Sequence, residues 1–129
     1  EPGDFVAFAL GLLSTFSRTH HQLGNTLIEL DGTGHANAET YFTAFHRMRS
    51  RGDPLAGPGA YDTEMDYFVG GRYIDRFALR DGEWKIVSRT GMTDWMRLEP
   101  PTSQGFIDIE ADTIGQRAPH DLLYRHPTG

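Results

Sequence analysis

The sequence predicts an α+β fold: a curved antiparallel sheet of about four strands with one helix packed on a face. Three observations predict it. One amphipathic segment opens the chain, four strand-like segments follow it, and short glycine-containing turns or a single loop join those strands. A helix followed by closely connected strands is typical of an antiparallel meander, because parallel strands need long crossover connections.

The opening segment, residues 2–16 ("PGDFVAFALGLLSTF"), predicts a helix. Pro2 suits the first turn of a helix, and Asp4 favours the N-terminus because the helix dipole is positive there. Apolar side chains recur at the three- and four-residue spacing of one helix face. They are Phe5, Phe8, Ala9, Leu12 and Leu13.

Segments rich in β-branched and aromatic residues predict the strands. They cover residues 24–31, 35–48, 60–80 and 83–98. The sequences "DGTG" and "RDGE" predict tight turns, and residues 50–59 predict a loop because of their Gly and Pro content. Gly70-Gly71 interrupts the third strand and predicts a bulge or bend.

The length suits one domain with one core. We expect a single domain over residues 1–129, with its core in about residues 2–98 and an extended cover segment over 99–129. The chain begins at Glu1 with no stretch that resembles a signal peptide. We therefore expect that it was processed or trimmed, or that a front part precedes it.

Composition argues against several classes of partner. The net charge is −6 and the basic residues are scattered, so we expect no nucleic acid partner. No apolar run reaches about 18 residues, so we expect no membrane span. The absence of cysteine excludes disulfides and thiolate chemistry and fits a cytoplasmic location.

Two histidines of neighbouring strands are candidates for acid–base chemistry. His21 lies at the mouth of the first expected strand and His46 near the end of the second, so a hairpin around "DGTG" brings them close together. Alternation puts Phe42, Ala44 and His46 on one small, mostly apolar face, which is typical of a pocket lining. A histidine in such a place can act as a general base near neutral pH. The alternative for each is a half-buried structural histidine.

Other polar residues give weaker signals. His20 has the opposite parity to His21, so we expect it to be exposed or to point into the helix layer. Asn25 shares the parity of His21, and its amide either enters the same pocket or bonds the backbone at the sheet edge. Arg89 lies mid-strand, where it either holds a substrate carboxylate or developing enolate or pairs with Asp75 or Glu39. The histidines follow no recognised zinc spacing, so we expect no metal.

The stretches "RTHHQLGN", "AETYFTAFH" and "GGRYIDRFALRDGEWKIVSRTGMTDW" resemble the SnoaL-like branch of the nuclear-transport-factor-2-like superfamily over about residues 2–98. The resemblance implies a cone-shaped α+β barrel with a deep apolar pocket. In motif the chain is closest to lyases of the scytalone dehydratase and bile-acid 7α-dehydratase type. That implies that His21 and His46, 25 residues apart (46 − 21), are the catalytic histidines. Tyr73 takes the position of a pocket asparagine, and an Asp and tyrosines of the family site stand on helices that would precede Glu1.

The resemblance implies a small-molecule enzyme with histidine-based general acid/base chemistry and no metal or organic cofactor. The expected reaction is that of a dehydratase-type lyase on a cyclic, polyketide-like or steroid-like substrate. His21 would be the base, and His46 would orient it or handle the departing hydroxyl. The expected substrate-binding residues are Asn25, Arg89, Tyr73 and Phe42. An isomerase or cyclase, or a non-catalytic binding or structural subunit, are the alternatives, because one fold serves many functions.

The third expected strand also predicts self-association. Its apolar residues occur at both parities, with Tyr67 and Val69 on one face and Phe68 and Ile74 on the other. A sheet with a pocket on one side then leaves an apolar patch on the other, which usually marks an interface. We expect a trimer or dimer, and SnoaL-like dehydratases often associate in this way.

Overall fold

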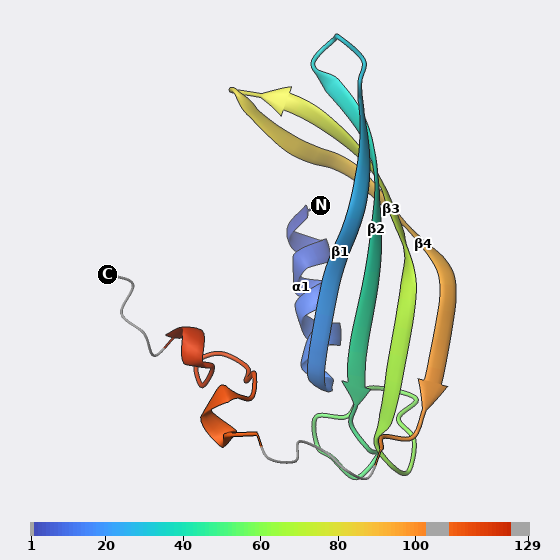
Figure 1. Ribbon diagram of the computed structural model, residues 1–129, viewed down its shortest axis with the longest axis vertical. Coiled ribbons are helices and arrows are strands. Elements are labelled where there is room, and N and C mark those ends of the chain that lie inside the picture. The colour runs from blue at the N-terminus through green and yellow to red at the C-terminus, as the bar shows by residue number, and fades with distance from the viewer. Residues whose placement is uncertain (1, 103–108, 125–129) are drawn as a thin grey trace.

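The computed structural model describes residues 2–102 and 109–124 (Figure 1). Within these residues one α-helix and four long strands form the body of the molecule. They are α1 (Pro2–Ser14), β1 (Phe16–Leu30), β2 (His35–Met48), β3 (Met65–Arg80) and β4 (Glu83–Glu99). Two short 3₁₀ helices, Ala111–Thr113 and Leu122–Tyr124, follow the last strand.

The strands form one antiparallel sheet in the order β1-β2-β3-β4, each paired with its neighbour in the sequence. Figure 1 shows that the sheet curves without closing on itself and that α1 lies beside β1. The predicted α+β fold, with a curved sheet of four antiparallel strands and one helix, is confirmed. The sheet does not enclose the helix, because Phe8 and Leu10 of α1 remain 67% and 63% exposed.

The predicted element bounds differ most at strand starts. β2 has the predicted bounds, and α1 ends two residues before the predicted 16, at Ser14. β1 begins at Phe16, well before the predicted 24, because residues without clear alternation pair with the second half of β2. β3 begins at Met65 instead of 60, since the residues before it belong to the loop: Tyr61 O accepts from Arg51 N at 2.7 Å.

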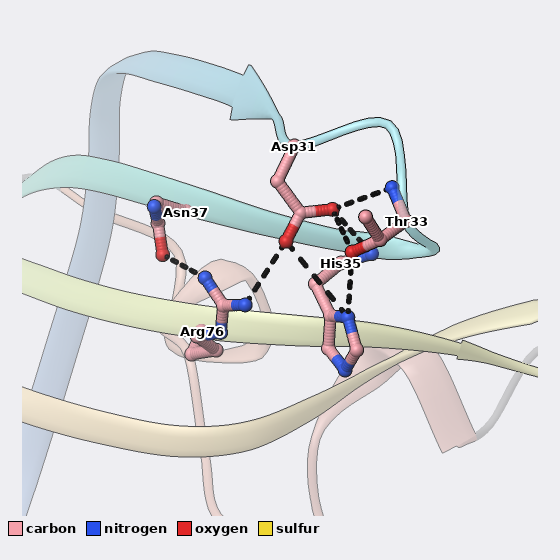
Figure 2. Close-up of polar contacts among 5 residues, drawn as sticks. All are labelled: Asp31, Thr33, His35, Asn37 and Arg76. Atoms are coloured by element: carbon pink, nitrogen blue, oxygen red, sulfur yellow. Dashed lines mark hydrogen bonds and ion pairs between the residues drawn. The ribbon is translucent and has the colours of Figure 1, made fainter.

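The predicted "DGTG" turn is held by one carboxylate (Figure 2). Asp31 Oδ1 accepts from Thr33 N at 2.8 Å, Thr33 Oγ1 at 2.8 Å and His35 N at 3.1 Å. Its Oδ2 accepts from Arg76 Nη2 at 3.0 Å, and Arg76 Nη1 donates to Asn37 Oδ1 at 2.9 Å. The hydrogen bond from the Thr33 backbone is the main cause that lowers the Asp31 pKa. The ionised carboxylate therefore ties the β1–β2 hairpin to β3.

Gly70-Gly71 marks the predicted irregularity. The register between β3 and β4 shifts between these two residues and leaves Asp94 of β4 as the extra residue of a bulge. A Cβ on Gly70 would collide with the Trp95 indole, and one on Gly71 would collide with the carbonyl oxygen of Met92. The glycines are needed because β4 lies too close to β3 for a side chain at either position.

The register defines two faces of the sheet. The histidine face carries His21 beside Ala44 and His46 beside Tyr67, because directly paired residues point to the same side. The outer face carries His20 and Phe45. The buried apolar residues are small and lie mostly on the histidine face: Ala36, Ala38, Ala44, Ala60, Val69 and Ala78.

The C-terminal segment returns to the start of the sheet. Arg117 Nη2 donates to Leu13 O at 2.7 Å and to Phe16 O at 2.8 Å, which fixes this segment to the junction of α1 and β1. The predicted cover segment lies partly outside the described residues, at 103–108 and 125–129. No helix in the described ranges is long and apolar enough to cross a membrane.

Candidate active site

The two candidate histidines meet on the histidine face. His21 pairs with Ala44 and His46 pairs with Thr19, so the two imidazoles stand diagonally across the β1–β2 ladder. Their Nε2 atoms are 2.9 Å apart, and the rings meet edge to face with centroids at 4.9 Å. The structure thus brings together residues 25 positions apart (46 − 21), as the hairpin argument expected.

Two aromatic rings surround the pair, and sequence reasoning gave neither a role in the site. The Phe16 ring lies 4.7 Å from the His46 ring, and the Tyr67 ring stacks on His46 at 5.7 Å. Tyr67 is paired with His46 across β2 and β3, so the alternation of β3 was the signal that would have found it. His46 is 7% exposed, whereas His21 is open to solvent. One histidine is therefore held and the other is accessible.

The environment favours neutral imidazoles. Burial is the main cause that lowers the pKa of His46 to about 4, and the charge of His21 acts in the same direction. Burial also lowers the pKa of His21, followed by the charge of His20. At neutral pH both rings are uncharged, so His21 can accept a proton.

The contact between the rings requires one donor and one acceptor, and the tautomers of the two rings decide which is which. One Nε2 carries hydrogen and the other accepts it, because two neutral imidazoles cannot both donate or both accept at this contact. His46 Nδ1 is buried, and among the described residues it has no hydrogen-bond partner of ordinary geometry. The Tyr67 backbone nevertheless acts to raise the His46 pKa, which favours a proton on this ring. A proton on His46 Nδ1 leaves its Nε2 to accept from His21 Nε2–H. His21 Nδ1 then keeps a lone pair for a substrate.

A second cluster on the same face contains three other predicted residues. Phe42 and Tyr73 stack with ring centroids at 4.4 Å, and the Arg89 guanidinium lies 4.2 Å from the centre of the Tyr73 ring. Arg89 Nε and Nη2 each donate to a different Asp75 oxygen at 2.7 Å. Asp75 is 3% exposed. Of the two possibilities for Arg89, the structure shows the ion pair with Asp75, whose hydrogen bond is the main cause that raises the Arg89 pKa.

The two clusters lie apart along the sheet. His46 and Thr40, the partner of Tyr73, are six residues apart on β2, which corresponds to roughly 20 Å along an extended strand. Phe42 lies between them, paired with Gly71 at the bulge. One small substrate cannot touch both ends of this row at once.

Asn25 does not follow the expected alternation. The β1–β2 register shifts between Leu23 and Thr26, so Asn25 belongs to a bulge. Beyond it Thr26 Oγ1 donates to Thr40 Oγ1 at 3.1 Å, which puts Thr26 on the histidine face. The parity argument that joined Asn25 to His21 is therefore wrong, because one extra residue inverts the alternation.

His20 is exposed on the outer face, one of the two outcomes expected for it. It lines a hollow together with residues of the C-terminal segment, and sequence reasoning assigned no role to that segment beyond covering. Among the described residues no group of three or more His, Asp or Glu side chains could hold a metal ion.

Solved structures share this fold. The Kfla4162 protein of Kribbella flavida has a TM-score of 0.58 and 18% identity, over 74% of this chain and 59% of that chain. A type 2 hexachlorocyclohexane dehydrochlorinase has a TM-score of 0.54 and 14% identity, over 72% and 57%. A putative scytalone dehydratase from Novosphingobium aromaticivorans DSM 12444 has a TM-score of 0.53 and 22% identity, over 78% and 62%.

These alignments cover roughly three fifths of the length of the solved structures. A comparison with curated proteins returned no match. A profile of the SnoaL-like domain matches residues 1–90. With the curved four-stranded sheet and its helix, this match shows that the chain belongs to the SnoaL-like domain family.

Proposed function

We propose that this protein is a cofactor-independent small-molecule enzyme in which the His21–His46 pair supplies general acid/base catalysis. The observation that carries the proposal is the 2.9 Å contact between the two Nε2 atoms, with one ring buried and the other accessible. An accessible neutral imidazole that is hydrogen-bonded to a buried one can take up a proton and return it. The reaction that fits best is elimination of water, as in a dehydratase-type lyase.

In the proposed reaction His21 Nδ1 removes a proton from the carbon next to a carbonyl group. The electron pair of the broken C–H bond forms the new double bond, and the bond from the neighbouring carbon to its hydroxyl breaks. The proton on His21 passes to the leaving hydroxyl, which departs as water and returns His21 to its neutral form. His46 Nε2 accepts from His21 Nε2–H throughout and stabilises the transient imidazolium.

A ring-containing, largely apolar substrate fits this proposal. Phe16 and Tyr67 offer aromatic faces beside the histidines, and Phe42 extends this apolar surface along β2. Two of the matched structures are described as a dehydrochlorinase and a putative scytalone dehydratase, and both names denote eliminations. In this proposal Arg89 positions the Tyr73 ring through the contact of its guanidinium with the ring face. Asp75 already accepts from two of its nitrogens.

We also propose that the working form is a trimer or dimer. Large apolar side chains of β4 remain exposed in the single chain, and such patches usually mark interfaces. Trp95 and Met92 on β4 are 49% and 43% exposed. Light scattering at micromolar concentration checks this, and a monomer mass would refute it. The cytoplasmic location and the lack of a nucleic acid partner stay predictions from composition.

The enzyme proposal is tested with a panel of cyclic β-hydroxyketones, scytalone among them, incubated with the protein in D₂O. Proton NMR follows two events separately: loss of the proton next to the carbonyl group and appearance of the alkene. Both events, absent when His21→Ala replaces the wild-type protein, support a dehydratase. Deuterium incorporation without alkene supports the alternative of an isomerase with the same base. Neither event with any compound, although one binds, favours the non-catalytic binding module.

A further inference from the structure

A hollow lies on the other side of β1 from His21. Its volume is about 610 Å³, within the range of small-molecule sites. The first part of β1 and the end of β2 form one wall, with Arg18, Phe45 and Arg49. The C-terminal segment forms the other wall, with Arg117 and His120. Neither His21 nor His46 lines it.

The lining is positively charged in a chain whose net charge is −6. Three arginines face one carboxylate, that of Asp121, and that carboxylate already accepts from Gln116 N at 2.8 Å and Leu123 N at 3.0 Å. Several guanidinium groups gathered in one hollow of a negatively charged chain are typical of an anion site, because their planar N–H donors match carboxylate and phosphate oxygens.

The guanidinium of Arg117 is held in place before any ligand arrives. Its Nη2 donates to the carbonyl oxygens of Leu13 and Phe16, and both bonds use this one nitrogen. Arg49 donates through Nη1 to Asp53 at 2.7 Å, and its buried Nε has no acceptor within the described part of the chain. A site with fixed donors spends little conformational entropy on binding.

We propose that this hollow binds a small organic anion, a carboxylate or phosphate carried on an aromatic ring. The arginines recognise the anionic group, and Phe45 offers an apolar wall for the ring. The site is separate from the histidine pair, because Arg18 and Phe45 stand on the outer face of the sheet.

Isothermal titration with benzoate and with phenyl phosphate tests the proposal, with benzamide as the neutral analogue. We expect binding tighter than about 1 mM for at least one of the two anions and none for benzamide. Arg18→Gln and Arg49→Gln should each weaken binding about 10- to 100-fold, which is the usual effect of losing a charge-assisted hydrogen bond. Backbone amide shifts at Gln116 and Arg117 in NMR spectra locate the bound anion.

Arg51→Gln is the matched control, because Arg51 pairs with Asp62 at the surface, 71% exposed, and does not line the hollow. Its affinity should equal that of the wild-type protein. Thermal midpoints separate lost binding from lost folding, since Arg49 also holds Asp53. Binding by neither anion, equal binding of benzamide, or loss of binding in His21→Ala but not in Arg18→Gln would each overturn the proposal.

Discussion

The histidine face holds two clusters that satisfy their polar groups in opposite ways. At one end Asp75 is buried as a charge and is fully matched by the forked guanidinium of Arg89. At the other end His46 is buried as a neutral ring, and its Nδ1 lacks a partner of ordinary geometry in the described residues. The ion pair is complete, whereas the histidine pair has hydrogen-bonding capacity left over.

The difference separates structural from chemical roles. One guanidinium holds both oxygens of this buried carboxylate, so this end of the face supports the sheet. Two neutral imidazoles can pass a proton with little rearrangement, since each nitrogen can either donate or accept. The residues that the sequence assigned to one site therefore form two groups. Arg89, with Asp75, supports the sheet, and His21 and His46 form the candidate reacting centre.

The largest expected effect is at the accessible histidine. His21→Ala should lower kcat/KM about 100- to 10,000-fold with the substrate found in the deuterium experiment, because general-base catalysis typically contributes that much. Steady-state kinetics measure the loss, and circular dichroism should show that the variant is folded since His21 is open to solvent.

His35→Ala is the control for this prediction. His35 lies at the far end of the hairpin, where its side chain is 43% exposed beside Asp31. It should keep activity within about threefold, as expected for a surface residue outside the site. Equal losses in both variants, or a His21→Ala protein that is unfolded, would make His21 a structural residue.

Breaking the Asp75–Arg89 ion pair should lower the free energy of unfolding. Arg89→Met leaves the Asp75 carboxylate buried without its partner and should lower the free energy of unfolding by about 2 to 3 kcal/mol. The double variant Asp75→Asn/Arg89→Met removes the buried charge and should recover part of that loss. Urea denaturation measures both. A double variant less stable than Arg89→Met alone would contradict this view of the cluster.

The histidine pair should make stability depend on pH. The pKa of His46 is about 4 in the folded protein and 6.5 in its ordinary state, so between these values the unfolded chain binds more protons. The free energy of unfolding is therefore fully developed above about pH 6.5 and falls as pH is lowered toward 4. Between pH 7 and pH 5 the loss should reach up to about 2 kcal/mol.

Denaturation series at several pH values check this dependence, with His46→Leu for comparison. The variant should lose much of the slope between pH 7 and pH 5, because its side chain cannot titrate. NMR titration of His46 in the wild-type protein should give a pKa near 4. An unchanged slope in His46→Leu would assign the pH dependence to other groups.

The smallest effect concerns the bulge between the clusters. Gly71→Ala should cost about 1 to 2 kcal/mol of stability, because its Cβ would collide with the Met92 carbonyl and push β4 away. Gly91→Ala is the matched control, since a Cβ there meets nothing within 4 Å. Thermal denaturation compares them, and equal effects would mean that the bulge tolerates a side chain.

Much of the fold could be predicted because short local sequences mark its turns and the bulge between β3 and β4. The "DGTG" turn joins β1 to β2, the "RDGE" turn joins β3 to β4, and Gly70-Gly71 marks the irregularity between β3 and β4, all where the sequence predicts them. The start of β1 could not be predicted, because its first residues become a strand only through long-range pairing with β2.

The contact between the two candidate histidines could be predicted, whereas the arrangement of the residues around them could not. The spacing of His21 and His46 matched a hairpin register, which alternation can foresee. The alternation expected for Asn25 does not hold, because a bulge adds one residue without any sequence signal stronger than Gly24. The arrangement around Arg117 depends on a return of the chain from its C-terminal segment, which local patterns do not encode.

The two bulges of β1 also determine which of its side chains point to which face of the sheet. Register shifts lie on both sides of the histidine pair, one between Phe16 and Arg18 and the other between Leu23 and Thr26. The six residues between them keep a fixed phase relative to β2, with His20 on one face and His21 on the other. The extra residue of the first bulge lets Phe16 and His21, which differ in parity, both contact His46 on one face. The same strand paired regularly from Phe16, with no extra residue, would set His20 in the place of His21 opposite Ala44. The bulge therefore decides which of two identical side chains faces each site.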